Sequence, residues 1–238
     1  MKNKLLLLLF LLGVVFPLSA QESEVLISTS HTSLLLSTPQ GGELKFLYYG
    51  RKLTDADVHA VVSTESGSFS AYPVYGLNCP SESALSVQHE DGNMTLQMEV
   101  IGVETIHQEK ADLTVISLKD KVYPFYVKLC YKAYQDVDVI EAWTEISHKE
   151  KKNVKLNQFA SAYLPVRKGN VWLSSLYGAW ANEARLVQEP LEPGMKVIKN
   201  KDGVRNSHTA HAEVMFSLDG QPRENSCLLY RSDAADDR

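Results

Sequence analysis

The side chains that could perform catalysis are spread through this sequence, and no familiar motif gathers them. The serine-hydrolase pattern Gly-x-Ser-x-Gly and the zinc-protease pattern His-Glu-x-x-His are both absent. His208 and His211 are three residues apart, so in an extended chain they point to opposite faces. His107 and Glu109 can share a strand face, but two ligands without a third do not form a metal site. The sequence therefore predicts no metal and no cofactor.

Carboxylates are plentiful, but their spacing selects no catalytic pair. The sequence contains 29 acidic residues, far more than a glycosidase needs. Such an enzyme uses one pair of carboxylates, held about 5–5.5 Å apart in the retaining mechanism. Each acid here is equally compatible with a solvated surface, so no catalytic residue is assigned.

Aromatic residues beside glycine form a more informative pattern. They occur in FLYYG (residues 46–50), AYPVYG (71–76) and LYGAW (176–180). Exposed rings at loop tips suit sugar binding, because the apolar C–H face of a pyranose packs on a ring while polar groups take its hydroxyls. The alternative, that these rings pack in the core or in turns, has equal support from composition. Trp180, which ends the last segment, is the main candidate for a sugar contact.

The charge of the chain argues against one class of partner. The net charge is −5, and the densest basic stretch, residues 148–155, is interrupted by Glu150. Phosphate binding needs clustered Lys and Arg, so we expect no nucleic-acid partner.

Residues 1–20 have the pattern of a secretory signal peptide. Lys2 and Lys4 precede an apolar run over residues 5–16, and Leu18-Ser19-Ala20 provides a small-residue cleavage site. The apolar run is short for a membrane span of ~20 residues. We therefore expect a periplasmic or secreted protein that begins near Gln21 and is not anchored in a membrane.

The segment CLLYRSDAADDR, residues 227–238, resembles the translation of a transposon-end sequencing adapter. The adapter frame has Thr where this chain has Arg231. We expect residues 227–238 to be an assembly artefact and the natural chain to continue beyond Ser226. A genuine polar terminus is the alternative.

Two other cysteines, Cys79 and Cys130, lie between these ends. Export permits a disulfide, but the sequence does not place the two within bridging distance. Two free thiols are the simpler expectation, and whether they pair stays open.

The remaining residues, 21–226, predict a single all-β domain. Short runs of Val, Ile, Leu, Tyr and Phe alternate with Gly and Pro, and nothing sustains a helical period over three turns. This pattern is typical of antiparallel sheets packed face to face. Two alternating runs around Asp91-Gly92 predict a β-hairpin.

Two strands in the middle of the chain have clear faces. Over residues 125–132, Phe125, Val127, Leu129 and Tyr131 share one face, and Lys128 and Lys132 share the other. Over residues 139–146, the core face is predicted to hold Ile140, Ala142, Thr144 and Ile146. Trp143 then points outward with Glu141 and Glu145.

Five segments together resemble a known family. In chain order they are FLYYGRKL, YPVYG, YPFYVKLCYKAYQDVDVIEAWTEI, LYGAWANEARL and KDGVRNSHTAHAEVMFSLD. They resemble the N-terminal domain of bacterial family 36 glycoside hydrolases, the melibiase-type α-galactosidases, over nearly all of residues 21–226. The loop GLNCPSES after Gly76 departs from the Asp-x-Arg pattern of the family, which puts any role of that loop in doubt. A second departure begins at Cys227.

The resemblance implies a β-supersandwich of antiparallel sheets, of the galactose-mutarotase-like type. In the family this domain precedes a (β/α)₈ barrel, which bears both catalytic Asp residues. The implied reaction is retaining hydrolysis of terminal α-linked galactose by a parent enzyme that is a homo-oligomer. This chain is then expected to hold no catalytic residue and to be inactive alone.

The resemblance also assigns substrate contacts. Trp180 matches the Trp of the family's Gly-x-Trp segment, which implies an apolar wall of the galactose subsite. Glu183 and Arg185, on one side of an extended chain, are expected to pair and hold the loop. Asp55 and Asp57 are weaker candidates to line the same mouth across an oligomer interface. A free-standing carbohydrate-binding module and a purely structural interface domain stay open as alternatives.

Overall fold

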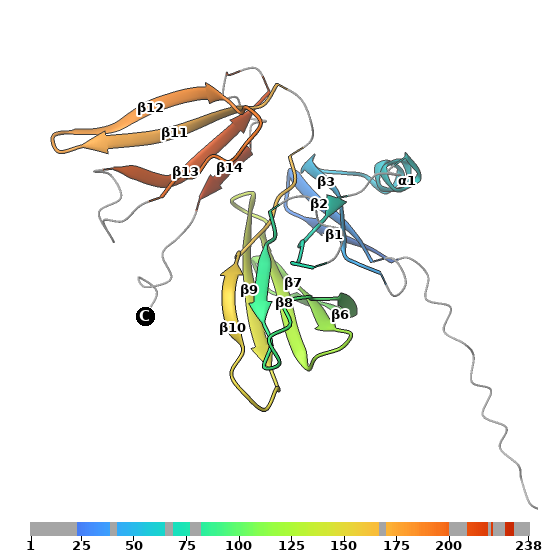
Figure 1. Cartoon of the computed structure of the whole chain (residues 1–238). Helices are drawn as coiled ribbons and strands as arrows, with labels where there is room; N and C mark the ends of the chain where they lie inside the picture. Colours follow the sequence, from blue (N-terminus) through green and yellow to red (C-terminus); the bar gives the residue numbers. More distant parts are fainter. Residues whose placement is uncertain are drawn as a thin grey trace, which may run out of the picture.

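The structure is a computed structural model, and it describes residues 23–38, 42–64, 69–76, 82–166, 170–199, 209–218, 220 and 227–230. The expected signal peptide and Cys79 lie outside these residues. The described residues form fourteen strands and one helix, so the predicted all-β sandwich of antiparallel sheets is confirmed. In Figure 1, β1–β3 are blue, β6–β9 run from green to yellow, and β11–β14 run from orange to red.

The first sheet is antiparallel, with the strand order β1-β2-β3-β4. Its strands are β1 (Ser23–Ser28), β2 (Thr32–Thr38), β3 (Lys45–Arg51) and β4 (Phe69–Ser70). Leu34, Leu35 and Leu36 of β2 are all buried, so both faces of this strand are covered. Gly50 lies inside β3, so the aromatic segment FLYYG belongs to a strand and is not a loop tip. A Cβ at Gly50 would lie 2.7 Å from the Tyr48 hydroxyl, so a larger residue there requires the Tyr48 side chain to shift.

The second sheet has the order β6-β7-β8-β9 and consists of long hairpins. Its strands are β6 (Met98–His107), β7 (Ala111–Asp120), β8 (Phe125–Tyr134) and β9 (Val139–His148). The predicted faces are confirmed: Phe125 and Val127 are buried in the core, whereas Lys128 is exposed. Ile140 and Ile146 of β9 pack against the same core.

A short antiparallel pair joins β5 (Leu85–Gln88) to β10 (Lys155–Phe159). The predicted turn is present, since the His89 N–H donates to the Asn93 carbonyl over 2.8 Å. The predicted hairpin is wrong, because the residues after Asn93 do not pair with β5. Leu85 also forms a parallel bridge with Val74, so the backbone of β5 has other partners on both sides.

The third sheet has the order β12-β11-β13-β14. Its strands are β11 (Trp172–Ala179), β12 (Asn182–Pro190), β13 (Ala210–Ser217) and β14 (Cys227–Tyr230). β14 pairs with β13, although residues 227–238 are expected to be adapter-derived. The origin of that segment stays a prediction, which this pairing does not test.

One hydrophobic core joins the first two sheets and the β5–β10 pair. Its members from β1 to β3 include Ile27, Leu36 and Phe46, and its members from β7 and β8 include Ile116 and Leu129. Burial of apolar surface contributes about 25 cal/mol per Å². Because most of the buried hydrophobic residues belong to this core, its burial is the main stabilising interaction among the described residues.

Asp120 closes the turn between β7 and β8 from inside. Its carboxylate is 1% exposed and accepts backbone N–H groups from Gln97, Val122 and Tyr123 over 2.6, 2.8 and 2.7 Å. Charge-assisted bonds of this kind are stronger than neutral ones. The side chain therefore holds the start of β6 against the end of β7.

We predict that Asp120→Asn lowers the free energy of unfolding by about 2–3 kcal/mol, because an amide cannot accept all these bonds and leaves a buried N–H unsatisfied. Urea denaturation of the chain, followed by tryptophan fluorescence, measures the loss. Asp136→Asn, at an exposed turn residue, is the matched control and changes stability by less than about 0.5 kcal/mol. Equal effects of the two substitutions would contradict this role.

Candidate functional site

The β11–β12 hairpin presents the residue that the sequence singles out most strongly. Ala179 pairs with Asn182, so Trp180 and Ala181 form the connection between the strands. Trp180 is 85% exposed, more than any other large apolar side chain among the described residues. In Figure 1 the closed end of this hairpin extends away from the rest of the chain. The indole is therefore available to a ligand or another protein surface.

The backbone near Trp180 is strained. Ala181 and Ala184 have φ of +58° and +54°, in the left-handed region that costs a side-chain-bearing residue about 1–2 kcal/mol. Tyr177 pairs with Arg185, so β12 places two residues opposite Gly178 and forms a bulge. Strain of this kind clusters at functional sites, and here it fixes how the tip projects.

The bulge corrects one assumption about Glu183 and Arg185. Ala184 between them is left-handed, so the chain there is not simply extended. Alternation alone therefore no longer places the two side chains on one side. Their pairing stays a prediction.

The base of the hairpin is anchored, unlike its tip. Gln188 donates from Nε2 to Ser174 Oγ and to the Gly220 carbonyl, both over 3.1 Å. Gly220 has φ of +72°, and a Cβ there would lie 2.9 Å from the Trp172 ring. These contacts join the hairpin to Gly220, and β11 also pairs with β13, so the base of the hairpin is held while the tip projects.

Asp55 and Asp57 lie in the first turn of α1 (Asp55–Thr64), a helix that the sequence analysis does not predict. Asp57 Oδ2 accepts the Thr54 N–H over 2.9 Å, and the Asp57 N–H donates to Thr54 Oγ1 over 3.3 Å. This is a capping box, and its Thr-x-x-Asp signal is visible in the sequence. The bond from the Thr54 backbone lowers the pKa of Asp57. The capping box explains Asp57 without a ligand.

The structure does not bring Asp55 and Asp57 close to Trp180. In Figure 1, α1 lies at the right of the molecule and the closed end of the β11–β12 hairpin lies at the far left. Both acids are exposed, and α1 has no buried residue. A shared role with Trp180 therefore needs a second copy of the chain.

The other aromatic segments divide between core and surface. Tyr72 is 3% exposed, and its hydroxyl donates to the Ala160 carbonyl over 2.8 Å. Burial raises its pKa. Tyr75 is 49% exposed, on the turn before Gly76. Of these two tyrosines, only Tyr75 could contact a sugar.

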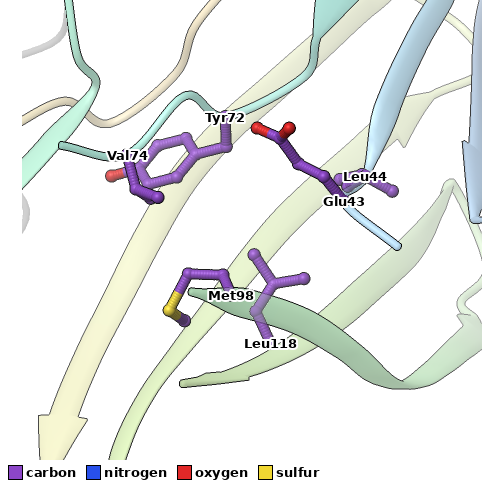
Figure 2. Close-up of a pocket in the computed structure, with 6 residues that line it drawn as sticks. All are labelled: Glu43, Leu44, Tyr72, Val74, Met98 and Leu118. Carbon is purple, nitrogen blue, oxygen red and sulfur yellow. The ribbon is translucent and has the colours of Figure 1, made fainter. Parts of the chain in front are cut away.

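A small cavity beside Tyr72 is too narrow for a pyranose ring (Figure 2). Its volume is about 40 Å³, and its lining consists of Glu43, Leu44, Tyr72, Val74, Met98 and Leu118. Pockets for small ligands usually measure about 300–1,000 Å³. Glu43 provides the only carboxylate of this lining, and it accepts the Ser70 hydroxyl. The cavity is a gap in the packing at the end of the core.

A buried acid–base pair, missed by the sequence analysis, is closed to solvent. His89 Nδ1 lies 2.8 Å from Glu150 Oε1, with side chains that are 0% and 2% exposed. The Tyr123 ring stacks on His89 with 3.7 Å between centroids. A general acid or base must reach its substrate, so this pair has a structural role, joining the 89–93 turn to the loop after β9.

The described residues contain no group of three or more His, Cys, Asp or Glu side chains arranged to hold a metal ion. No helix within the described part of the chain is long and apolar enough to span a membrane. Cys130 is a buried free thiol, and burial raises its pKa.

Comparison with protein families matches residues 42–231 to the glycosyl hydrolase family 36 N-terminal domain. The matched range contains Trp180, Asp55 and Asp57. No curated protein sequence matches the chain.

Solved structures of GH36 α-galactosidases share this fold. A variant of AgaA from Geobacillus stearothermophilus, in complex with raffinose, is 19% identical with a TM-score of 0.73, and the match covers 82% of this chain and 31% of that one. AgaB from the same organism is 20% identical with a TM-score of 0.73, covering 84% and 31%. The α-galactosidase from Lactobacillus brevis is 20% identical with a TM-score of 0.71, covering 83% and 31%. The chain thus spans under a third of the length of these enzymes.

The strained bulge gives a direct test of the hairpin geometry. We predict that Ala184→Val lowers the free energy of unfolding by about 1–2 kcal/mol, because a β-branched residue tolerates positive φ poorly. Ala184→Gly leaves stability unchanged or raises it slightly, since glycine adopts this φ freely. Ala179→Val is the control at the last residue of β11, where φ is not positive. Thermal unfolding of the three variants checks this, and equal melting of Ala184→Val and Ala179→Val would refute the left-handed conformation.

Proposed function

The chain belongs to glycosyl hydrolase family 36, as the N-terminal domain of that family, and we propose that it is the substrate-wall and assembly domain of an α-galactosidase. The parent protein hydrolyses terminal α-linked galactose with retention. The observation that carries the proposal is the family match together with the projecting, 85% exposed Trp180.

Trp180 forms an apolar wall of the galactose subsite in this proposal. An indole face packs well against the C–H face of a pyranose, and a ring on a strained, anchored hairpin is preorganised for that contact. Two variants of one similar enzyme, AgaA, were solved with galactosides, raffinose in one case and stachyose in the other. We propose that such α-galactosides are also the substrate class of the parent of this chain.

The chemical step belongs to the part of the parent beyond this chain. A retaining glycosidase needs a nucleophile and an acid/base about 5–5.5 Å apart, and the family resemblance assigns both to a barrel domain. The chain spans 31% of the length of AgaA, which leaves room for such a barrel. The chain contributes a binding wall, and the missing barrel is its main partner.

Assembly is the second part of the proposal. Asp55 on α1 reaches the galactose subsite of a neighbouring subunit in a homo-oligomer, which accounts for its distance from Trp180 within one chain. Asp57, whose carboxylate accepts the Thr54 N–H, holds the first turn of that helix. The parent is exported to the periplasm or secreted, as the basic and apolar pattern of residues 1–20 indicates.

In the full-length enzyme, Trp180→Ala raises KM for raffinose by about tenfold, the loss of roughly 1.4 kcal/mol of stacking and apolar contact. Trp180→Phe recovers part of the loss because it keeps an aromatic face. Phe159→Ala removes an exposed ring on β10 and serves as the control. Steady-state kinetics give KM and kcat separately, and unchanged kinetics in Trp180→Ala would reject the subsite role.

The chain alone is expected to release no nitrophenol from p-nitrophenyl α-D-galactopyranoside. Folding of the same preparation is verified by circular dichroism, so that inactivity reflects missing groups and not a lost fold. Turnover by the purified chain that is lost on removing one of its own acids would place catalysis in this domain and contradict the proposal.

A further inference from the structure

The sheet β6–β9 has a second face, which points away from the core. Because Ile140 and Ile146 pack inward, alternation turns Glu141, Trp143 and Glu145 outward on β9. Lys132 and Lys128 lie directly opposite Glu141 and Glu145 on β8. We call these five residues, Lys128, Lys132, Glu141, Trp143 and Glu145, the outer face.

Trp143 occupies the centre of the outer face, above an apolar strip. The register places Val115, Cys130 and Trp143 side by side on three neighbouring strands. Cys130 is 2% exposed although it lies on the side away from the core, so neighbouring side chains must lie over it. Trp143 lies directly opposite Cys130 and is half-buried. This exposure is expected of an indole ring that lies along the sheet and covers Cys130.

The charged groups of the outer face contact aromatic side chains. Trp143 donates from Nε1 to Glu145 Oε1 over 3.3 Å, and the Tyr134 hydroxyl donates to Glu141 Oε2 over 2.9 Å. The Lys132 ammonium lies 4.9 Å from the centre of the Tyr134 ring.

The expected ion pairs across the strands are not formed. Opposite charges facing one another on a solvated sheet normally attract. Among the described residues, however, neither Lys128 nor Lys132 has a carboxylate oxygen within 4.0 Å. The ammonium groups therefore keep donors available to a ligand, and each carboxylate keeps acceptor sites.

We propose that the outer face binds a neutral oligosaccharide, with Trp143 as the stacking platform. The two lysines and two glutamates on β8 and β9 balance one another. Glu99, Glu104 and Lys119 lie on the same side of β6 and β7 and leave this side of the sheet with one net negative charge, which disfavours a strongly charged ligand. Sugar hydroxyls both donate and accept, so they match carboxylates and ammonium groups together. Glu141 and Glu145 are four residues apart, about 13 Å along the strand, which suits a ligand of two or more sugar units.

The site differs from the proposed galactose subsite in its residues. It involves neither Trp180 nor the β11–β12 hairpin, and all its residues are present on β8 and β9. The two hypotheses can therefore fail independently.

Affinity electrophoresis of the whole chain tests the proposal. Native gels contain galactomannan, amylopectin or mixed-linkage β-glucan as neutral probes, and polygalacturonate as the anionic comparison. We expect at least one neutral polysaccharide to retard the chain, and polygalacturonate to retard it no more than a plain gel. Retardation by none of the neutral probes, or by polygalacturonate alone, overturns the proposal.

Variants then locate the binding. Trp143→Ala weakens the association constant for the retarding polysaccharide by about tenfold or more, whereas Trp180→Ala leaves it within about twofold. If Trp143→Ala does not fold by circular dichroism, the double substitution Lys132→Met and Glu141→Gln, at a half-buried and an exposed position, replaces it and is expected to weaken binding by a similar factor. Binding that survives these changes, or that is lost in Trp180→Ala alone, refutes the outer face as the site.

Discussion

The alternation of side chains along β7, β8 and β9 is the constraint on which the rest of the structure depends. A strand has a period of two, so filling the core with Ile116, Phe125 and Val127 forces the intervening residues to the opposite face. A one-residue shift in the pairing of β8 would turn Lys128 into the core and turn Phe125 and Val127 toward solvent. The positions of Trp143 and its charged neighbours on the outer face therefore follow from hydrophobic burial on the opposite face of the sheet.

Sequence reasoning succeeded where one period governs a whole element. β8 has clean alternation, and its inner and outer faces were predicted correctly. It failed where partners distant in the sequence decide the outcome. The turn at Asp91-Gly92 forms, but β5 pairs with β10 and Val74, because burial of Leu85 outweighs the local hairpin preference. α1 was missed although Thr54 and Asp57 provide a capping signal, since a ten-residue helix with no buried side chain leaves little periodicity.

The candidate site was only partly predictable for similar reasons. Sequence identified Trp180, because an aromatic residue after glycine is visible locally, and the structure adds its exposure and strained support. The bulge at Ala184 and the distance between α1 and the hairpin depend on the folded backbone. The His89–Glu150 pair was likewise hidden, because its partners are 61 residues apart. These features support the proposal that the domain binds and positions a substrate, and the match of the chain covers 31% of the AgaA structure.

The central claim is that this domain belongs to a longer enzyme whose catalytic acids follow it. The most direct measurement is the contiguous nucleotide sequence of the native locus beyond the codon for Ser226. The account predicts an open reading frame that departs from residues 227–238 and continues into a (β/α)₈ barrel with two catalytic Asp residues. A native stop codon directly after Arg238, or a continuation without such a barrel, would contradict it.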